Sequence, residues 1–274
     1  MEFKPSLDLL EKVDKLACDA AKEIQRHYGR AKPDTKADGS PVTEADQAAE
    51  AIILQGLATL APDIPVVAEE AAANGHIPDV ASGPFWLVDP LDGTREFIRN
   101  DGKGEFTVNI ALIVNGRPVL GVVVAPALGI VYGGLCGVGA YCRRENGANE
   151  PILARQEPAE GLTVVASRSH GDADALNRLL HATKVRDQRN IGSSLKLCLV
   201  AAGEADLYPR LGPTMEWDIA AGQAVLAAAG GRVETLDGAP MAYAKKGFRN
   251  PHFIAYGRCR SIERQPMPGS RSDA

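Results

Sequence analysis

The sequence predicts a layered α/β protein whose first half is α+β. Apolar residues recur at helical spacing near the N-terminus, and β-rich runs joined by short turns follow them. Beyond residue 150, short apolar strands alternate with helical segments, which is typical of sheets covered by helices. With 274 residues the chain can bury one large core or two smaller ones.

Two helices are expected to open the chain. Apolar residues on one helical face predict the first helix over residues 6–28. The second is expected to begin at Thr43, a typical capping residue, and to run to about Leu60. The polar residues 30–41 between them are predicted to form a surface loop, a kind of segment that can also act as a lid.

Strands are expected to make up the rest of the first half. The dipeptide Asn115-Gly116 lies between two β-rich runs, which is a strong signal for an antiparallel hairpin. The expected strands are residues 66–68, 85–88, 107–114, 119–125, 130–135 and 140–143.

The second half is expected to alternate strands with helices. The expected strands are residues 163–166, 185–190, 205–208, 232–235 and 253–255, and the expected helices are residues 173–181, 194–202 and 217–229. A polar stretch at 143–158, with glycine and prolines, predicts a boundary between an N-terminal half, residues 1–150, and a C-terminal half, residues 151–258. Residues 259–274 are expected to form a disordered tail.

Composition and charge narrow the class of protein. The formal net charge of −5 argues against binding of nucleic-acid polymers through their phosphates, although a bound metal would still allow a small phosphate ligand. No apolar run approaches the roughly 20 residues that span a bilayer, and the first residues lack the apolar core of a signal peptide, so we expect a cytoplasmic protein. The five cysteines include no Cys-x-x-Cys pair and are expected to be reduced thiols.

The most informative stretch is the acidic turn after the apolar run at 85–88. Pro90 fixes φ and lacks an N–H, so the strand is expected to end there and to leave Asp89 and Asp92 together on a tight loop. Two carboxylates that close repel each other unless a cation lies between them or one is protonated. The backbone carbonyl of Leu91 would add a third hard oxygen, and such a set without nearby Cys or His favours Mg²⁺ over zinc. The simpler alternative is an ordinary turn, in which Asp-Pro and Asp-Gly are common.

Three more acidic positions occur where one element passes into the next. Glu69 follows the strand at 66–68, and Asp46 and Asp218 each lie near the start of a helix. Taken alone, each has an ordinary explanation, since surface acids and acidic helix caps are common. The candidate metal ligands are Glu69, Asp89, Asp92, Asp218 and the Leu91 carbonyl. Together they form an all-oxygen set able to hold two or three Mg²⁺ ions, an arrangement that suits phosphoryl transfer.

The nucleophile is expected to be a metal-activated water. Thr94 lies on the same loop as the ligands. If Asp46 accepts a hydrogen bond from Thr94, the threonine oxygen can in turn accept one from the water, so we take these two residues as the candidate catalytic pair. The backbone N–H groups around Gly93 and Thr94 could also hold a phosphate oxygen.

Three motifs make the sequence resemble the Mg²⁺-dependent, lithium-sensitive inositol monophosphatase superfamily. They are Glu-Glu at residues 69–70, Asp-Pro-Leu-Asp-Gly-Thr at 89–94 and Trp-Asp-Ile-Ala-Ala-Gly at 217–222. The resemblance covers nearly the whole chain. Within the superfamily the sequence is most similar to the CysQ branch, the 3'(2'),5'-bisphosphate nucleotidases, in the runs at 94–97, 166–170, 192–198 and 205–210.

The resemblance implies both a fold and a reaction. The fold is an αβαβα layered sandwich, and the reaction is hydrolysis of the 3'-phosphate of adenosine 3',5'-bisphosphate to AMP and phosphate, which recycles a by-product of sulfate assimilation. It further implies the metal ligands and the catalytic pair given above. The residues implied to contact the nucleotide that remains are His170, Ser193, Lys196 and Arg210. From chemistry alone, Lys196 near a helix start and the fork of Arg210 favour an anion site, although solvated surface charges are the plainer alternative.

Other readings stay open at this point. An inositol or sugar-phosphate monophosphatase with the same metal core is the nearest alternative. A non-catalytic regulator would be expected to lack a ligand or one of the catalytic pair, and none is missing. No Gly-x-x-x-x-Gly-Lys-Ser/Thr motif is present, which disfavours a P-loop enzyme. The resemblance also allows a homodimer and a peripheral contact with the cytoplasmic face of the inner membrane.

Glu216 is a local departure from the family pattern. It adds an acid close to Asp218. Two roles are open for it: a solvated neighbour of the site, or a group that perturbs the third metal or the sugar contact.

Overall fold

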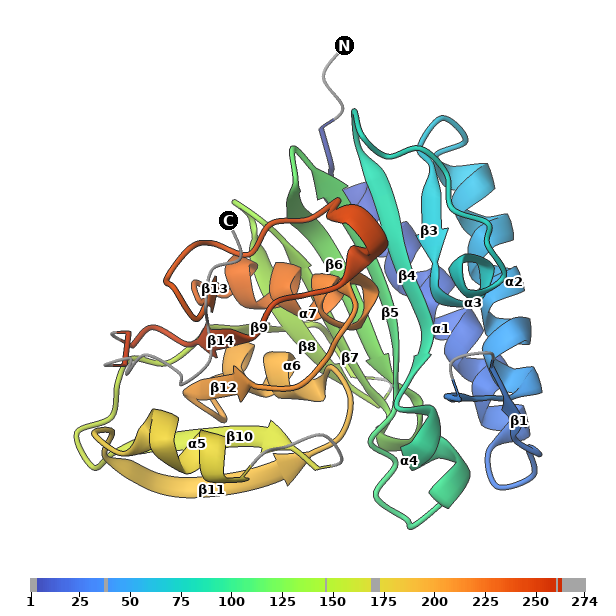
Figure 1. Cartoon of the computed structure of the whole chain (residues 1–274). Helices are drawn as coiled ribbons and strands as arrows, with labels where there is room; N and C mark the ends of the chain where they lie inside the picture. The colour runs from blue at the N-terminus through green and yellow to red at the C-terminus, as the bar shows by residue number, and fades with distance from the viewer. Residues whose placement is uncertain (1–3, 37–38, 146, 169–172, 260, 263–274) are drawn as a thin grey trace.

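Helices and sheets alternate through the molecule as helix, sheet, helix, sheet and helix layers (Figure 1). The computed structural model describes residues 4–36, 39–145, 147–168, 173–259 and 261–262. The helices are α1 Leu7–His27, α2 Glu44–Leu60, α3 Glu69–Ala73, α4 Thr94–Arg99, α5 Ala173–Leu180, α6 Leu195–Ala201 and α7 Glu216–Ala228, with the 3₁₀ turns η1 Pro126–Leu128 and η2 Lys246–Phe248. The strands are β1 Asp34–Thr35, β2 Pro41–Val42, β3 Val66–Ala68, β4 Phe85–Asp92, β5 Thr107–Val114, β6 Arg117–Ala125, β7 Ile130–Leu135, β8 Gly139–Arg144, β9 Glu150–Ile152, β10 Leu162–Ser167, β11 Val185–Ile191, β12 Leu207–Arg210, β13 Arg232–Thr235 and β14 Phe253–Tyr256.

The larger sheet has seven strands in the order β3-β4-β5-β6-β7-β8-β9. Only the β3–β4 pair within it is parallel. The β5–β6 hairpin turns at Asn115 and Gly116, whose φ angles of 52° and 68° lie in the left-handed region that a two-residue hairpin turn requires. The predicted hairpin is therefore confirmed.

Strand β4 continues through Pro90, so the prediction that the strand ends there is wrong. β3 pairs only with residues 86–88 of β4, and the register between β4 and β5 shifts between Asp89 and Asp92. The missing N–H of Pro90 therefore falls in an irregular part of the ladder, where no neighbouring strand needs it. The same irregularity still leaves Asp89 and Asp92 together at the end of the strand.

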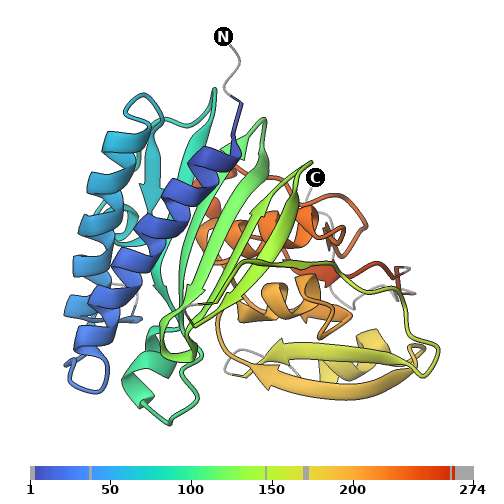
Figure 2. The ribbon, with the colours of Figure 1, turned by 180° about the vertical axis from the view of Figure 1, so that it is seen from behind.

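Helices α1 and α2 cover the outer face of the seven-stranded sheet (Figure 2). The Ser6 hydroxyl caps α1 by accepting the Leu9 N–H at 3.2 Å, and the Thr43 hydroxyl caps α2 by accepting the Ala45 N–H at 3.2 Å. Their apolar faces pack with one face of the sheet, around Trp86, in a continuous core. Both predicted helices are confirmed.

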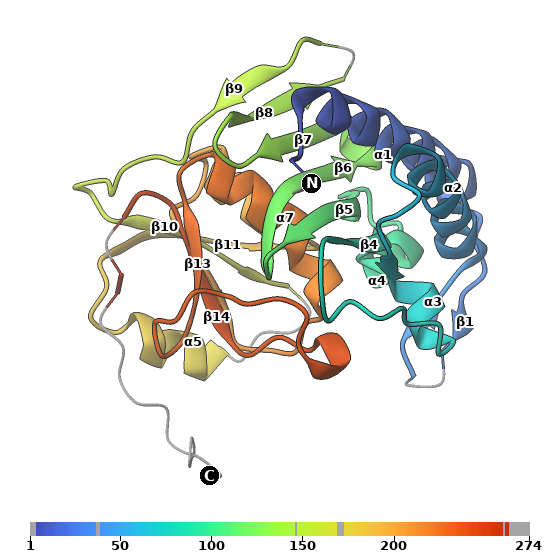
Figure 3. The ribbon, with the colours of Figure 1, turned by 90° about the horizontal axis from the view of Figure 1, so that it is seen from above.

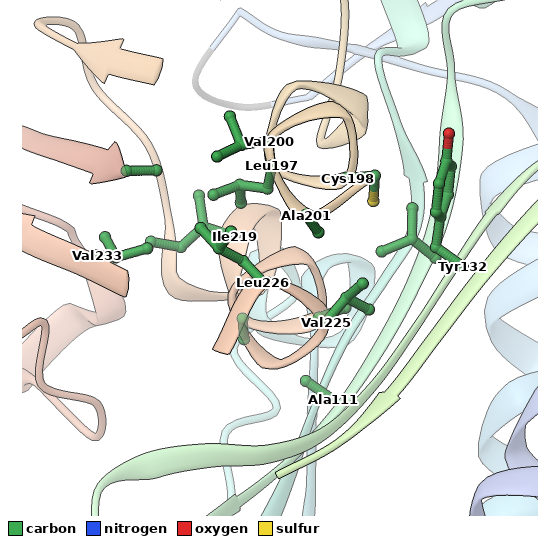
Figure 4. Close-up of a cluster of buried hydrophobic side chains, with 14 of the residues drawn as sticks. Ala111, Tyr132, Leu197, Cys198, Val200, Ala201, Ile219, Val225, Leu226 and Val233 are labelled. Carbon is green, nitrogen blue, oxygen red and sulfur yellow. The ribbon is translucent and has the colours of Figure 1, made fainter. Parts of the chain in front are cut away.

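Helix α7 lies between the two sheets (Figure 3), and α6 packs beside it in the same layer (Figure 4). A Cβ on Gly121 of β6 would lie 2.3 Å from the carbonyl oxygen of Ala221 in α7, and a Cβ on Gly134 of β7 would lie 2.7 Å from Cα of Val225. The glycines of the strands and the small residues of α7 thus permit an approach that larger side chains would block. The central layer is held in place by this close packing.

The second sheet has the order β11-β10-β12-β14-β13. β10 is parallel to both β11 and β12, whereas β14 is antiparallel to its two neighbours. Helix α5 covers the outer face of this sheet through Leu176 and Leu179, which pack with Val164 and Ile254. The predicted alternation of the second half and the αβαβα sandwich are confirmed.

The predicted limits of the two halves do not coincide with breaks in the packing. β9 pairs with β8 and carries the large sheet past residue 150. Cys259, which we placed in the disordered tail, is only 6% exposed, and its Sγ lies 3.4 Å from the carbonyl oxygen of Asp206. The packed fold therefore reaches past residue 258. Residues 260 and 263–274 of the predicted tail lie outside the described residues.

The elements that were not predicted are short. They are α3, α4, β1, β2, β9 and the 3₁₀ turns η1 and η2, each of six residues or fewer, so none shows a full hydrophobic period. All five cysteines are free thiols, as expected. Within the described ranges, no helix is both long and apolar enough to cross a membrane.

Candidate active site

A cavity of about 260 Å³ lies between the end of β4 and the loop that joins β11 to α6. The predicted site residues that line it are Glu69, Asp89, Leu91, Asp92, Gly93, Thr94, Ser193, Lys196, Arg210 and Asp218. Asp46 lies behind Thr94 rather than in the cavity wall. The position of His170 lies outside the described residues.

The turn between β4 and α4 presents the acidic motif. The Leu91 N–H donates to Oδ1 of Asp89 at 3.0 Å, which folds the backbone back on itself. Gly93 has a φ of 93°, and a Cβ there would lie 3.1 Å from the carbonyl oxygen of Glu105, so the turn requires glycine. Helix α4 begins at the next residue, Thr94.

Thr94 and Asp46 are hydrogen-bonded, which meets the condition set for the candidate catalytic pair. Thr94 Oγ1 donates to Asp46 Oδ1 at 3.2 Å and also lies 3.1 Å from the Leu91 carbonyl oxygen, so its single proton can serve only one of them at a time. The other carboxylate oxygen of Asp46 accepts both the N–H and the hydroxyl of Thr43, each at 2.7 Å. Burial raises the pKa of Asp46 although the Thr43 hydrogen bonds oppose this. A raised pKa makes Asp46 a stronger proton acceptor.

Asp89, Asp92 and Asp218 place negative charges close together. Asp89 is 1% exposed, whereas Asp92 and Asp218 keep part of their surface open to the cavity. Burial raises the pKa of all three groups, and repulsion from neighbouring acids raises it further. For Asp92 the pKa reaches only about 6, because the charge of Lys196 opposes the effect of burial. Glu69 is the first of the neighbouring acids that raise the pKa of Asp89.

Asp218 and Asp46 occupy equivalent positions in their helices. Each is the third residue of its helix and accepts the N–H of the capping residue, from Met215 at 2.9 Å and from Thr43 at 2.7 Å. The ordinary capping role that we weighed for these acids is therefore real. It coexists with a place at the site, because the second carboxylate oxygen remains for other partners.

The donor set fits a hard cation such as Mg²⁺, since it consists of carboxylate and carbonyl oxygens that repel one another without a counter-charge. As the described side chains stand, no group of three or more His, Cys, Asp or Glu is gathered to hold an ion. Instead Lys36 Nζ lies 2.7 Å from Glu69 and 2.6 Å from Glu70, and it supplies positive charge there. The contact with Lys36 uses Oε1 of Glu69.

Lys196 and Arg210 bring positive charge to the same cavity. Lys196 Nζ donates to the carbonyl oxygen of Ile191 at 3.1 Å and to that of Ser193. Burial lowers the pKa of Lys196 to about 8. Arg210 Nη2 donates to the carbonyl oxygen of Pro213 at 2.7 Å, while its buried Nε has no hydrogen-bond partner among the residues described. Arg210 thus retains a donor that a ligand could satisfy.

Glu216 has a structural role rather than a place in the cavity. It is fully buried, and its carboxylate accepts the N–H groups of Ala244 at 3.0 Å and Lys245 at 2.9 Å. The Lys245 ammonium lies 2.7 Å away. The extra acid beside Asp218 therefore anchors the loop at 244–245, and it is neither solvated nor among the residues that line the cavity.

Sequence reasoning missed three charged residues that shape the site: Lys36, Glu50 and Glu105. Glu50 accepts the N–H of Glu70 at 2.9 Å and so caps the helix on which Glu69 lies. Its position four residues after Asp46 on one helix was a usable signal, because residues so spaced share a face. Lys36 and Glu105 reach the site across long separations in the sequence, and no local pattern identifies them.

Comparison with known proteins gives consistent matches over almost the full chain. The model of the inositol monophosphatase family matches residues 7–264. The 3'(2'),5'-bisphosphate nucleotidase CysQ of Escherichia coli strain K12 is 47% identical over 249 residues, which cover 89% of this chain and 98% of that protein. The protein of the same name from Salmonella typhimurium is also 47% identical over 249 residues.

Solved structures agree with these matches. CysQ from Bacteroides thetaiotaomicron, described as a bacterial member of the inositol monophosphatase family, has a TM-score of 0.76 at 36% identity and covers 91% of this chain and 97% of its own. An inositol monophosphatase from Thermotoga maritima has a TM-score of 0.74 at 28% identity and covers 92% and 93%.

Proposed function

The chain belongs to the inositol monophosphatase family, and we propose that within it the protein is a 3'(2'),5'-bisphosphate nucleotidase. Its preferred substrate is adenosine 3',5'-bisphosphate, from which it releases the 3'-phosphate and leaves AMP. One observation carries this proposal. A single cavity joins the carboxylates Asp89, Asp92 and Asp218 to the cations Lys196 and Arg210. A bisphosphate needs an anion site beside the reaction centre, and the two cations can supply it.

The carboxylates are proposed to hold Mg²⁺. The residues that would bind two or three ions are Glu69, Asp89, Asp92, Asp218 and the carbonyl of Leu91. Bound Mg²⁺ supplies positive charge for the phosphoryl oxygens and lowers the pKa of a nearby water. The raised carboxyl pKa values support this assignment, because they reflect a charge cluster that a divalent cation would neutralise.

Thr94 and Asp46 are proposed to accept the proton of the attacking water. Thr94 Oγ1 accepts that proton while its own passes to Asp46 Oδ1, 3.2 Å away. The two Thr43 hydrogen bonds fix the Asp46 carboxylate in place, so that Oδ1 stays directed at Thr94. The raised pKa of Asp46 favours this transfer.

The rest of the substrate is proposed to lie against the second half of the chain. Lys196 and Arg210 bind the phosphate that is kept, with Ser193 beside them, and the Gly93 and Thr94 N–H groups hold an oxygen of the phosphate that is removed. The assignment of His170 as a nucleotide contact stays a prediction. The cytoplasmic location, a homodimer and a peripheral membrane contact are likewise proposals from the family resemblance.

A second candidate function is hydrolysis of inositol or sugar monophosphates. The observation that favours it is the acidic turn itself, which requires only one phosphate to act. Nothing in that turn depends on Lys196 or Arg210 being matched by a second phosphate. The two activities can therefore coexist with different KM values.

The test is phosphate release measured side by side from adenosine 3',5'-bisphosphate and inositol 1-phosphate, with Mg²⁺ and with a chelator. A higher kcat/KM for the bisphosphate, lost when the chelator is added, is the expected result. A preference for inositol 1-phosphate would keep the metal centre and overturn the substrate. Release from neither substrate would overturn the enzymatic proposal.

A further inference from the structure

Glu105 ties two loops of the second half to the first half without lining the cavity. It lies between α4 and β5, and its side chain is 13% exposed. Oε2 of Glu105 accepts the Gly192 N–H at 2.7 Å. Arg168 approaches both carboxylate oxygens, with Nη1 2.6 Å from Oε2 and Nη2 2.8 Å from Oε1, and Nη2 also donates to the Asn190 carbonyl at 2.9 Å. One carboxylate thus holds together the ends of β10 and β11.

The contact between Glu105 and Gly192 is as close as the backbone allows. A Cβ on Gly192 would lie 2.8 Å from the carbonyl oxygen of Glu105 and 3.0 Å from its Cβ. The next residue, Ser193, has a φ of 47°, a conformation that costs a non-glycine residue free energy and persists where neighbouring contacts impose it. Glu105 makes such a contact with Gly192, the residue immediately before Ser193.

Residues 191–196 form a segment that Glu105 ties to the first half. Ser194 adds a further tie, because its hydroxyl donates to Asn109 Oδ1 at 2.7 Å and lies 2.9 Å from the hydroxyl of Thr107. Lys196 Nζ donates to carbonyl groups of the same segment, so the ammonium follows its backbone. The place of Lys196 in the cavity therefore depends on how the 191–196 segment is anchored.

We propose that Glu105 is a positioning residue that sets the affinity for the part of the substrate that is not cleaved. It acts through Gly192 and Arg168, which fix the 191–196 segment and with it Ser193 and Lys196. This inference rests on the proposed function. Because Glu105 does not touch the acidic turn through its side chain, its loss changes KM for a bisphosphate far more than kcat. A monophosphate, which does not need the second anion site, is affected little.

Two substitutions separate the contacts of Glu105. Glu105→Gln keeps an oxygen that can accept the Gly192 N–H but removes the charge that pairs with Arg168, whereas Glu105→Ala removes both. We expect KM for adenosine 3',5'-bisphosphate to rise about tenfold or more in Glu105→Ala and less in Glu105→Gln, because a displaced Lys196 would lose its charge-assisted contact with the retained phosphate. For both variants kcat should change by less than about threefold, and KM for inositol 1-phosphate by less than about twofold.

Glu234→Ala is the matched control. Glu234 is 17% exposed, pairs with Arg232 at 2.7 Å, and lies on β13, and it is not among the residues that line the cavity. The Glu234→Ala variant should leave unchanged the ratio of KM for adenosine 3',5'-bisphosphate to KM for inositol 1-phosphate. An equal change in that ratio in Glu234→Ala, or equal KM increases for both substrates in the Glu105 variants, would overturn the positioning role.

Amide hydrogen exchange gives a readout that does not need activity. In Glu105→Ala the amides of residues 192–196 should exchange faster than in the wild type, and Glu105→Gln, which disturbs the fold least, serves if the alanine variant does not fold. Unchanged exchange in both would overturn the inference. If the wild type releases no phosphate from the bisphosphate, the proposed function has failed. If the wild type is active and KM is unchanged in the Glu105 variants, the positioning role alone has failed.

Discussion

The acidic turn after β4 and the 191–196 segment after β11 line the same cavity, but they differ in how far their charged groups are compensated by their neighbours. In the acidic turn, Asp89 and Asp92 stay close to other carboxylates, and burial with mutual repulsion raises their pKa values. In the 191–196 segment, the charge of Lys196 is satisfied by carbonyl groups, and the backbone is anchored to Glu105. The acidic turn carries more negative charge than Lys196 offsets, whereas the ammonium of Lys196 has hydrogen-bond acceptors within its own segment.

This difference assigns separate tasks to the two regions. A charge cluster that needs a cation suits the reaction centre, where charge develops during phosphoryl transfer. A rigid, internally satisfied segment suits recognition, since little ordering is then needed when the substrate binds. Changes in the acidic turn should therefore act on kcat, and changes in the segment should act on KM.

Asp92→Asn should have the largest effect, with a fall in kcat of about a thousandfold or more, because the change removes a metal charge while keeping the shape of the side chain. Asp218→Asn should behave in the same way. Steady-state kinetics with a Mg²⁺ titration checks this, and thermal unfolding checks that the fold is kept. Full activity of Asp92→Asn in Mg²⁺ would show that the metal assignment is wrong.

Thr94→Ala should lower kcat by about a hundredfold or more with little change in KM, since it removes the oxygen that links the water to Asp46. Thr94→Ser is the matched control, because it keeps the hydroxyl and should retain most of the activity. Both are measured on the bisphosphate at saturating Mg²⁺. Equal losses in the two variants would mean that the methyl group, not the hydroxyl, is what matters.

Lys196→Ala should act mainly on binding, raising KM for the bisphosphate about tenfold while KM for inositol 1-phosphate changes little. Because burial lowers the pKa of Lys196 to about 8, its positive charge is lost as the pH rises through that value, and KM for the bisphosphate should rise there. Lys196→Arg keeps its charge at that pH and should lack this rise. KM for the bisphosphate is measured from pH 7 to 9.5 in the wild type and in Lys196→Arg. Identical pH profiles in these two proteins would contradict the prediction.

The sequence could predict features that depend on residues close together in the chain, and it missed features that depend on distant ones. The long helices, the Asn115-Gly116 hairpin and the alternating second half depend on residues that are neighbours in the chain, and they were found. The carboxylates of the acidic turn were found because their clustering is itself unusual. The run of β4 through Pro90 was missed because it depends on where the neighbouring strands stop pairing. Contacts between residues far apart in the chain, such as Glu105 with Gly192, leave no local pattern.

The smallest expected effect concerns the pH dependence of stability in the metal-free protein. Its sign is the reverse of the one that acidic groups usually give. Carboxyl groups whose pKa is raised on folding bind more protons in the native state than in the unfolded state, so the free energy of unfolding falls as the pH rises. For Asp92 this fall begins near its ordinary value of about 4 and is complete above about 6. Asp89 and Asp218 shift in the same direction.

In a chelator, Tm should therefore fall by a few degrees between pH 5 and pH 7.5, about 2–4 °C for each 1 kcal/mol in a chain of this size. Mg²⁺ should raise Tm more at pH 7.5 than at pH 5, because the ion competes with protons for the same carboxylates. Asp92→Asn removes one of these groups and should show a shallower fall in the chelator, which separates the acidic turn from other titrating groups. A Tm that rises over this range, together with a Mg²⁺ effect that does not depend on pH, would mean that the carboxylates of the turn are not an uncompensated charge cluster, and the contrast between the two regions would fail.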